Sequence, residues 1–411
     1  MKKSEVLGLV LAGGEGTRLS PLTRDRAKPA VPFGGQYRII DFVLSNFVNS
    51  EIYAIYVLVQ FKSQSLIEHL SAGWQIGGLL PDHFITAVPA QMRRGQMWYE
   101  GSADAVYQNA HLIANFHPEV VAVFGADHIY RMDIRQMLTF HRERDAEVTV
   151  ATFPVPIEEA SAFGIVDVEV DGRVIGFQEK PQQPQPMPGD PYHCLASMGN
   201  YLFSTSLLLE LVEQDAQRSA STRDFGRDIL PPLVGRRRLY AYDFRRQHLP
   251  GEPEDQVPYW RDVGTLDAYY EANMDLRAVA PLLNLYNPSW PIRTSSAPMP
   301  PAKFALNDWD RRGTSLNSIV SSGCIISGGT VVDSVLGRQV FVHSFSLVEG
   351  AVIMDNSHIH RHARVRRAII DKNVHVPPGE TVGWDLERDR QRFTVTDSGL
   401  VIVPKNYRFD S

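Results

Sequence analysis

Short apolar runs alternate with amphipathic stretches over the first 243 residues. The apolar runs predict buried strands at Val6–Ala12, Ala54–Val59, Val120–Phe124 and Val148–Pro154. Stretches with helical spacing of apolar residues lie between them, at Ser63–Leu70, Ala103–Phe116 and Ile134–Arg144. This rhythm predicts an α/β domain with an open, mostly parallel, Rossmann-like sheet. In such sheets, ligands bind beyond the carboxyl ends of the strands.

A different apolar pattern begins near the end of the chain. Apolar residues recur every six positions and, after a slip of one residue, continue to Val382: Val335, Phe341, Leu347, Ile353, Ile359, Val365, Ile370, Val376 and Val382. A six-residue period is typical of a left-handed parallel β-helix (hexapeptide repeat), in which each side of a coil points one residue inward. The alternative interpretation is a β-sandwich with coincidental spacing.

A segment rich in Pro and Asn separates the two patterns. Residues 279–302 contain six prolines, so we expect few contacts there and interpret the segment as a linker. The predicted division is therefore a first domain at 1–278, a linker at 279–302 and a β-helix domain at 303–411. Because the ends and flanks of a solenoid favour association unless they are covered, we also expect a homo-oligomer.

Composition excludes several classes of protein. The chain has 411 residues, 44% apolar and 21% charged, and its formal net charge of −6 gives no indication of nucleic-acid binding. Two cysteines, Cys194 and Cys324, cannot form a disulfide framework or a cysteine-type zinc site, which fits a cytoplasmic protein. No apolar run reaches the roughly 18 residues of a membrane span, so no membrane association is expected.

A glycine-rich turn follows the first predicted strand. Gly13, Gly14 and Gly16 allow close approach of the backbone to a ligand, and such turns bind phosphates through backbone N–H groups. Arg18 and Lys28 are natural partners for phosphates. The run lacks the Walker spacing, and it lacks the third glycine of a dinucleotide fingerprint. An ordinary glycine-rich turn remains the alternative.

The region from Leu9 to Asn46 resembles the signature of sugar-nucleotide pyrophosphorylases. The continuation Pro-Phe-Gly-Gly-Gln-Tyr-Arg-Ile-Ile-Asp-Phe narrows the resemblance to the ADP-glucose pyrophosphorylases (glucose-1-phosphate adenylyltransferases) of the bacterial glycogen pathway, and similarity extends from about Val6 to Val403. The resemblance implies transfer of the adenylyl group of ATP to α-D-glucose 1-phosphate, giving ADP-glucose and pyrophosphate. It also implies Mg²⁺, regulation by small anionic metabolites and a homotetramer.

The same resemblance implies roles for individual residues. Arg18 and Lys28 would act on the phosphates of ATP, and Asp127 with Asp262 would hold Mg²⁺. Glucose 1-phosphate would be bound by Tyr99, Gly164, Glu179, Lys180 and Ser197, and the nucleotide by Gly13, Gly14 and Gln91. Without the resemblance, Asp127 would equally suit a turn or a helix cap, and Asp262 a turn with a local ion pair. Ser102 is expected to be the N-cap of the helix that follows it.

Regulation is the point at which the chain departs from part of this family. Several relatives have a lysine at the position of Asp25, where it helps to bind a sugar-bisphosphate activator; an aspartate there would repel phosphate. Basic residues near this position and in the predicted β-helix suggest an anionic-effector cleft between the domains, with Arg26, Arg38, Arg366 and Arg367 as candidates. A solvated basic surface is the alternative. We expect weak or no activation by fructose 1,6-bisphosphate, and we expect Arg26→Ala to blunt the response to another metabolite while sparing unactivated turnover.

Several other functions share individual features of this sequence. The nearest is a pyrophosphorylase for another base or sugar, such as a UDP-glucose or GDP-mannose enzyme. A hexapeptide-repeat acyltransferase would need a catalytic histidine on the β-helix, where His343, His358, His360, His362 and His375 lie. A regulatory subunit without activity would tolerate loss of Asp127 or Lys180, but both are present. Asp224-Phe225-Gly226 resembles a kinase motif, yet no kinase catalytic loop accompanies it.

Overall fold

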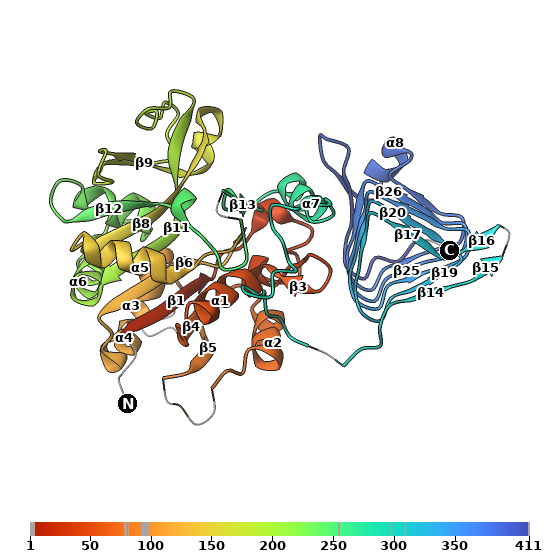
Figure 1. Ribbon diagram of the computed structural model, residues 1–411, viewed down its shortest axis with the longest axis horizontal. Helices are drawn as coiled ribbons and strands as arrows, with labels where there is room; N and C mark the ends of the chain where they lie inside the picture. Colours follow the sequence, from red (N-terminus) through yellow and green to blue (C-terminus); the bar gives the residue numbers. More distant parts are fainter. Residues whose placement is uncertain are drawn as a thin grey trace.

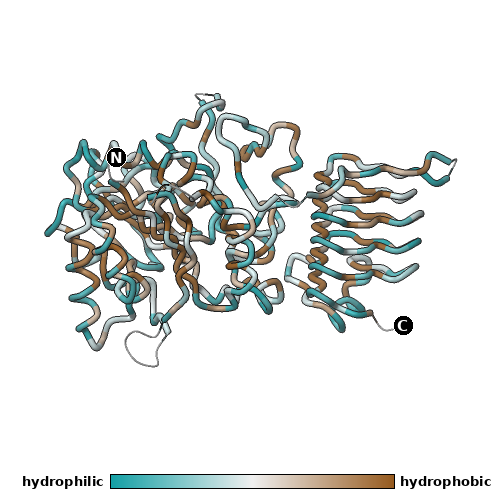
Figure 2. The backbone as a smooth tube through the Cα atoms, turned by 90° about the horizontal axis from the view of Figure 1, so that it is seen from below, coloured by the Kyte–Doolittle hydropathy of each residue, from teal (hydrophilic) through white to brown (hydrophobic). Residues whose placement is uncertain are grey.

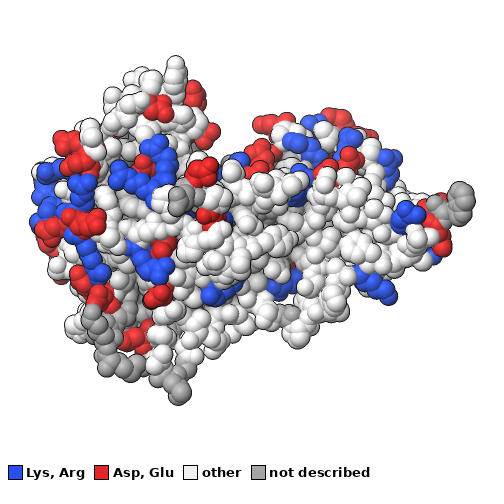
Figure 3. All heavy atoms as spheres, viewed as in Figure 1, with Lys and Arg blue, Asp and Glu red and all other residues white. Residues whose placement is uncertain are grey.

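The computed structural model describes residues 5–77, 80, 82–91, 98–253, 255–296, 298–308 and 310–409. Two domains lie side by side, an α/β domain and a β-helix, and an extended segment connects them (Figure 1). On the face drawn in Figure 3, acidic and basic side chains are interspersed over the α/β domain rather than separated by sign. None of the helices in the described part of the chain has the length and apolar character needed to cross a membrane.

The α/β domain is built on a nine-stranded sheet. Its main path is β10 (Val174–Glu179), β9 (Gly164–Val168), β11 (His193–Ser204), β6 (Val120–Gly125), β1 (Val6–Ala12), β4 (Ala54–Val59) and β5 (Phe84–Pro89). The run from β6 to β5 is parallel, as the sequence predicts. On the other side, β11 pairs antiparallel with β6, β8 (Val148–Pro156) and β9, and β12 (Leu239–Asp243) pairs parallel with β8.

Both faces of this sheet are covered. In β1, Val6 and Val10 pack into one apolar cluster while Leu7 and Leu9 pack into another, which explains the continuous apolar run. The helices that flank the sheet are α1 (Ile39–Asn49), α2 (Gln64–Gly73), α3 (Ser102–Gln108), α4 (Ala110–Phe116), α5 (Ile134–Glu143) and α6 (Thr205–Ala216), whereas α7 (Leu266–Asp275) packs in the apolar cluster shared with the β-helix. The single helix expected at 103–116 is divided at Asn109, whose side chain donates hydrogen bonds to the Ala105 carbonyl and to the Tyr99 hydroxyl.

Three parallel sheets form the sides of the β-helix, as predicted. One side is β14 (Lys303–Ala305), β19 (Ile325–Ser327), β22 (Phe341–Val342), β25 (His358–Ile359) and β28 (His375–Val376). The second is β17 (Thr314–Leu316), β20 (Thr330–Val332), β23 (Leu347–Glu349), β26 (Arg364–Arg366) and β29 (Thr381–Val382). The third is β18 (Ile319–Val320), β21 (Val335–Leu336), β24 (Val352–Ile353), β27 (Ala368–Ile370) and β31 (Val401–Val403), to whose edge β30 (Thr394–Val395) adds an antiparallel strand.

The repeat in the β-helix is not a strict period of six. Equivalent residues in successive coils pair at a spacing of 16 in the earlier coils, as with Ile325 and Phe341, and of 17 in later ones, as with Phe341 and His358, so none of these coils has three full six-residue sides. For this reason three of the residues predicted to point inward do not: Phe341 and Leu347 are partly exposed, and Val335 pairs with the outward-facing Val352. The residues next to them, Leu336, Val342 and Val348, lie in the core of the solenoid. Figure 2 shows the stacked coils with their apolar positions aligned along the solenoid.

The linker makes more contacts than expected. The described residues of 279–302 form no helix or strand, but Trp290 is buried. The Pro291 carbonyl accepts a hydrogen bond of 3.0 Å from Asn49, and the Arg293 amide donates one of 2.8 Å to Ser45. Proline prevents ladder pairing, but it does not prevent packing against a neighbouring helix, in this case α1.

The third side of the β-helix packs against the α/β domain. Val352, Ile369 and Ile402 point outward from β24, β27 and β31 and join one apolar cluster with Phe42 and Tyr269 of the first domain. Arg26 crosses this interface and forms two hydrogen bonds with Asp371, at 2.8 and 2.9 Å. The two domains therefore share a core, with a buried ion pair inside it.

Candidate active site

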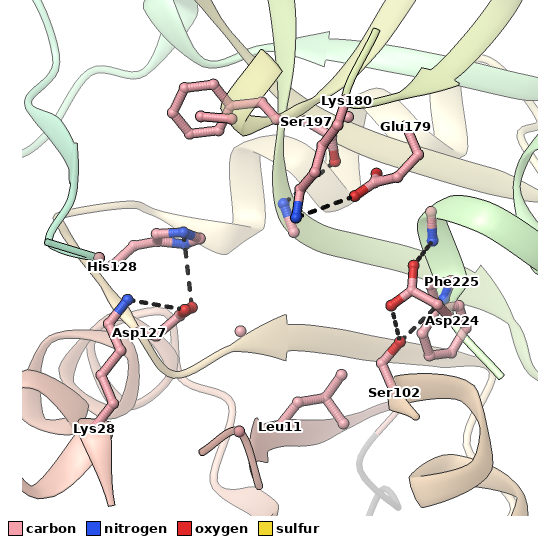
Figure 4. A pocket seen from close by; sticks show the side chains of 18 of the residues that line it. Leu11, Lys28, Ser102, Asp127, His128, Glu179, Lys180, Ser197, Asp224 and Phe225 are labelled. Atoms are coloured by element: carbon pink, nitrogen blue, oxygen red, sulfur yellow. Dashed lines mark hydrogen bonds and ion pairs between the residues drawn. The ribbon is translucent and has the colours of Figure 1, made fainter. Parts of the chain in front are cut away.

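A cavity of about 600 Å³ opens at the carboxyl edge of the parallel strands. The glycine-rich turn after β1 and the residues after β6 form one side, and β9, β10, β11 and the π-helical turn η4 (Phe225–Ile229) form the other (Figure 4). Its lining includes most of the predicted site: Gly14, Arg18, Lys28, Asp127, Gly164, Glu179, Lys180 and Ser197.

Gly16 gives the glycine-rich turn its shape. Its φ of +64° is left-handed, and a Cβ there would lie 2.9 Å from the Cβ of Lys28. The Thr23 hydroxyl donates a hydrogen bond of 2.8 Å to the Gly16 carbonyl and thereby stabilises the conformation of the turn. The turn therefore packs directly on Lys28, which explains why glycine is needed here and how Lys28 reaches the cavity.

Two carboxylates from distant parts of the sequence meet at Lys28. Strand β7 (His128–Tyr130) pairs antiparallel with β13 (Trp260–Asp262), and this register places Asp262 opposite His128. Asp262 thereby comes beside Asp127. The Lys28 ammonium lies 3.1 Å from Asp127 Oδ2 and 3.3 Å from Asp262 Oδ1.

Charge is concentrated in this group. Burial of Lys28 acts to lower its pKa, but Asp127 and Asp262 outweigh burial and raise it. Burial acts in the opposite sense on Asp127, yet Lys28 and His128 hold the pKa of that carboxyl well below its usual range. The carboxylate stays ionised at neutral pH and is available to a cation.

The residues present suit a divalent metal ion. Asp127, His128 and Asp262 each offer a ligand atom, and these atoms lie within 4.8 Å of one another. Two carboxylates provide the oxygen ligands that Mg²⁺ prefers. His128 was not predicted as a site residue; its Nε2 lies 3.7 Å from Asp127 Oδ1 and 3.9 Å from Asp262 Oδ1. The Asp-His pair in the sequence was the available signal for it.

Glu179 and Lys180 occupy the opposite wall (Figure 4). Lys180 has a left-handed φ of +52°, its amide donates to the Phe163 carbonyl at 2.9 Å, and its ammonium lies 3.8 Å from Glu179 Oε1. Burial raises the pKa of Glu179, and Asp224 adds to the increase while Lys180 opposes it. An uncommon backbone conformation that is held at a cavity wall fits a functional position.

Gly164 and Ser197 complete this wall. A Cβ on Gly164 would lie 2.9 Å from Glu179 Oε2 and 3.0 Å from the Phe177 ring, so the glycine makes room for the carboxylate. Ser197 precedes an irregularity in β11, where the pairing with β8 shifts register before Tyr201. Bulges of this kind redirect side chains, and here the Ser197 hydroxyl lines the cavity.

Ser102 and Asp224 form a support that the sequence did not reveal. The expected N-cap role of Ser102 is wrong, because Gly101 is the N-cap of α3. The Ser102 hydroxyl instead donates to Asp224 Oδ2 at 3.1 Å and accepts from the Phe225 amide at 3.0 Å. The Asp224-Phe225-Gly226 run, considered only as a kinase-like motif, is thus part of the cavity wall next to Glu179.

Tyr99 does not lie with the other predicted sugar-binding residues. It lines an adjoining cavity of about 280 Å³ with Gly13, Gly14 and Gln60. The Tyr99 amide donates to Gln60 Oε1 at 2.8 Å, which ties Tyr99 to the end of β4. Gln91 is exposed, two residues beyond the end of β5, so both residues lie at the edge where the parallel strands end.

The four predicted effector arginines do not gather in one cleft. Arg26 is buried and paired with Asp371, and Arg38 donates to the Ser65 carbonyl at 2.6 Å. Arg366 lies over the Trp384 ring and Arg367 over the Tyr270 ring. Arg367 and Asp371 lie four positions apart, on either side of strand β27, which corresponds to about 13 Å of extended chain. The Arg26–Asp371 ion pair and the Arg367–Tyr270 contact therefore lie at opposite edges of the interface.

Comparison with known proteins agrees with this geometry. Residues 7–279 match the family model described as nucleotidyl transferase, and residues 300–403 match the model for a GlmU-like, C-terminal hexapeptide domain. A glucose-1-phosphate adenylyltransferase of Thermus thermophilus is 56% identical over all of both chains. The chain belongs to the glucose-1-phosphate adenylyltransferase family. Two further members are those of Anaeromyxobacter sp. (53% identical) and Deinococcus radiodurans (52% identical), each over 99% of this chain and 100% of the relative. Membership makes this chain a nucleotidyltransferase, and the acyltransferase and non-catalytic alternatives are set aside.

Proposed function

We infer that this adenylyltransferase joins ATP and α-D-glucose 1-phosphate to give ADP-glucose and pyrophosphate, as the glucosyl-donor step of glycogen (α-glucan) synthesis in the cytoplasm. One observation carries the proposal: a single cavity has a lysine flanked by two carboxylates on one side and a Lys-Glu pair on the other. The first set suits a triphosphate with its metal ion. The second suits a phosphorylated sugar, because it offers one cation and one acceptor for hydroxyl groups.

The reaction needs positioning and charge neutralisation rather than a protein nucleophile. The phosphate oxygen of glucose 1-phosphate attacks the α-phosphorus of ATP in line, the bond to the β-phosphate oxygen breaks, and pyrophosphate leaves. Lys180 would hold the attacking phosphate, and Glu179 and Ser197 would accept or donate hydrogen bonds to the sugar. Gly13, Gly14 and Gln91 would bind the nucleotide, and Tyr99, which lies beside Gly13 and Gly14, fits that half of the cavity better than the sugar half.

Arg18 and Lys28 would stabilise the departing pyrophosphate. The Arg18 guanidinium lies near Gly264, on the loop that follows Asp262, and it is exposed to the cavity. Asp127 and Asp262 would hold the metal ion, for which we propose Mg²⁺, and the ion would neutralise charge on the phosphates. Lys28 pairs with both of these carboxylates and offsets part of their charge, and they in turn stabilise its buried ammonium.

Product analysis tests the substrate assignment. Purified protein is incubated with glucose 1-phosphate, Mg²⁺ and either ATP, UTP or GTP, and the sugar nucleotide and pyrophosphate are quantified. We expect ADP-glucose and pyrophosphate in equal amounts with ATP, and much slower turnover with UTP and GTP. Faster turnover with UTP, or with GTP and mannose 1-phosphate, would identify a pyrophosphorylase of another specificity.

For regulation, we propose that a phosphorylated or carboxylated metabolite acts at the domain interface. The supporting feature is a cationic group there: Arg38 interacts electrostatically with Arg26 and Arg338, and Lys372 with Arg38. Since Arg26 is engaged by Asp371 and Asp25 is an acid, fructose 1,6-bisphosphate should activate weakly or not at all. Strong activation by this compound that persists in Arg38→Gln would contradict both the role of Asp25 and this location.

For assembly, we propose a homotetramer with interfaces on the β-helix domain. Large apolar side chains are exposed on its first coils, at Phe304, Leu306 and Leu316. Exposed apolar surface of this kind favours contact with another chain. Light scattering at micromolar concentration is expected to give the mass of four chains; a fully active monomer would contradict the proposal.

A further inference from the structure

Five aromatic rings stand on the outer surface of one side of the β-helix. The register of β22, β25 and β28 places Phe341, His358 and His375 in one column. His343 and His360 follow two residues after Phe341 and His358, so they form a second column on the same surface. This side differs from the one that packs on the α/β domain, and adenylyl transfer makes no use of it.

Three of these histidines bring ring nitrogens together. One nitrogen from each of His343, His358 and His360 lies within 4.8 Å of the other two. His343 Nε2 and His358 Nδ1 are 3.4 Å apart. In a tetrahedral zinc site with Zn–N bonds of about 2.0–2.1 Å, ligand nitrogens lie about 3.3–3.4 Å apart, so one edge of such a site already has the required length. The His343 and His360 rings are stacked with centroids 4.7 Å apart and an interplanar angle of 18°, so binding of one ion by all three nitrogens requires rotation about χ2, a soft torsion.

The surroundings favour the metal-binding form of the rings. Burial, reinforced by His375, His343 and His360, lowers the pKa of His358 to about 4, and burial also lowers the pKa of His343 and His360. Imidazole binds a metal in its neutral form, which burial favours at these positions. His375 Nδ1 lies 3.3 Å from His360 Nε2, so a fourth imidazole adjoins the cluster.

We propose that His343, His358 and His360 bind one Zn²⁺-type transition-metal ion, with a fourth position open to water. A set of three imidazoles suits zinc, copper or nickel and is unsuited to Mg²⁺, which takes oxygen ligands. The site is therefore chemically distinct from Asp127 and Asp262. Because the ligands come from successive coils, the ion would tie β22 to β25 and stabilise the solenoid without entering the reaction.

Cobalt absorption tests the site on the full chain. Metal-free protein is titrated with Co²⁺ while excess Mg²⁺ fills the carboxylate site, and the visible absorption of tetrahedral Co²⁺ is followed. We expect one such ion per chain, with binding weakened at least about tenfold in His343→Gln and in His360→Gln. Zn²⁺ should raise the unfolding temperature of the wild type and have little effect on that of either variant.

Two controls make the result decisive. His362 lies on the same solenoid but stacks on Phe345 outside the cluster, so His362→Gln should bind Co²⁺ like the wild type. Circular dichroism checks that each variant is folded, and the two ligand variants test the site independently. The proposal is overturned if the wild type gives no tetrahedral absorption. It is also overturned if the absorption survives in both ligand variants but disappears in Asp127→Asn, which would place the ion at the catalytic carboxylates.

Discussion

Lys28 combines near-complete burial with a full positive charge. Its side chain is 8% exposed, and the charge persists because Asp127 and Asp262 lie within 3.3 Å. The two carboxylates stabilise the buried ammonium of Lys28, since a buried charge without a partner is strongly destabilising. The trio carries a net charge of −1, because one ammonium faces two carboxylates, so it retains negative charge to attract a divalent cation.

Lys180 provides a test at the same scale. A charge-assisted hydrogen bond contributes roughly 1.5–3 kcal/mol, so Lys180→Ala should raise KM for glucose 1-phosphate about 10- to 150-fold and change KM for ATP much less. Steady-state kinetics with each substrate varied in turn measures the difference. Lys303→Ala, on the exposed strand β14, is the matched control and should leave both constants unchanged. Equal shifts in both constants would place Lys180 outside the sugar-phosphate site.

Single residues were predicted from the sequence where they belong to a contiguous motif. The apolar runs that precede Arg18, Lys28 and Asp127 clearly predict strands. The location of these three residues at the edge of the sheet, where they line the cavity, could therefore be expected. The Asp-His pair marks His128 only as a neighbour of Asp127, and neither its approach to Asp262 nor the hydrogen bond from Ser102 to Asp224 could be read from the sequence. Such contacts depend on tertiary packing rather than on local pattern.

At the scale of elements, the glycine-rich turn is specified by sterics. Gly16→Ala forces an alanine into φ +64° with its Cβ 2.9 Å from Lys28 Cβ. The conformational cost alone is about 1–2 kcal/mol, and displacement of Lys28 should also lower turnover. The free energy of unfolding, measured with urea, should therefore fall by at least this amount.

Gly14→Ala is the control for this turn. A Cβ added at Gly14 would meet no heavy atom within 4 Å, so its substitution should leave the free energy of unfolding nearly unchanged. Equal destabilisation by the two substitutions would mean that loss of glycine flexibility, rather than contact with Lys28, determines the effect.

The three-residue strands β7 and β13 could not be predicted from the sequence. Strands β7 and β13 are too short to give a periodic signal, yet their pairing brings Asp262 to Asp127. The β-helix was predicted from its period, but the inward register at Val335, Phe341 and Leu347 was wrong because coils of 16 or 17 residues do not divide into equal sixes. Long-range pairing and coil length are properties of the assembled fold.

At the scale of the whole molecule, the domains are joined by a core and a buried ion pair. Arg26→Ala leaves Asp371 buried without its partner, which should cost about 3–5 kcal/mol and lower the unfolding temperature. This replaces the expectation that Arg26→Ala would spare the unactivated enzyme. Arg24→Ala, which removes an exposed arginine 3.9 Å from Asp25, is the control and should have almost no effect. Equal stability of the two variants would show that the Arg26–Asp371 pair is not structural.

We propose that two distant segments, which carry Asp127 and Asp262, build one metal-dependent site for adenylyl transfer. The most direct measurement is the rate of ADP-glucose formation at saturating Mg²⁺ in Asp127→Asn, Asp262→Asn and the double variant. Each single substitution should lower turnover on the order of 10²-fold or more, since metal electrostatics supply several kcal/mol, and the double variant should be little slower than the slower single one because the pair acts as a unit. Near-normal turnover in either single variant, or effects that multiply in the double variant, would contradict the account.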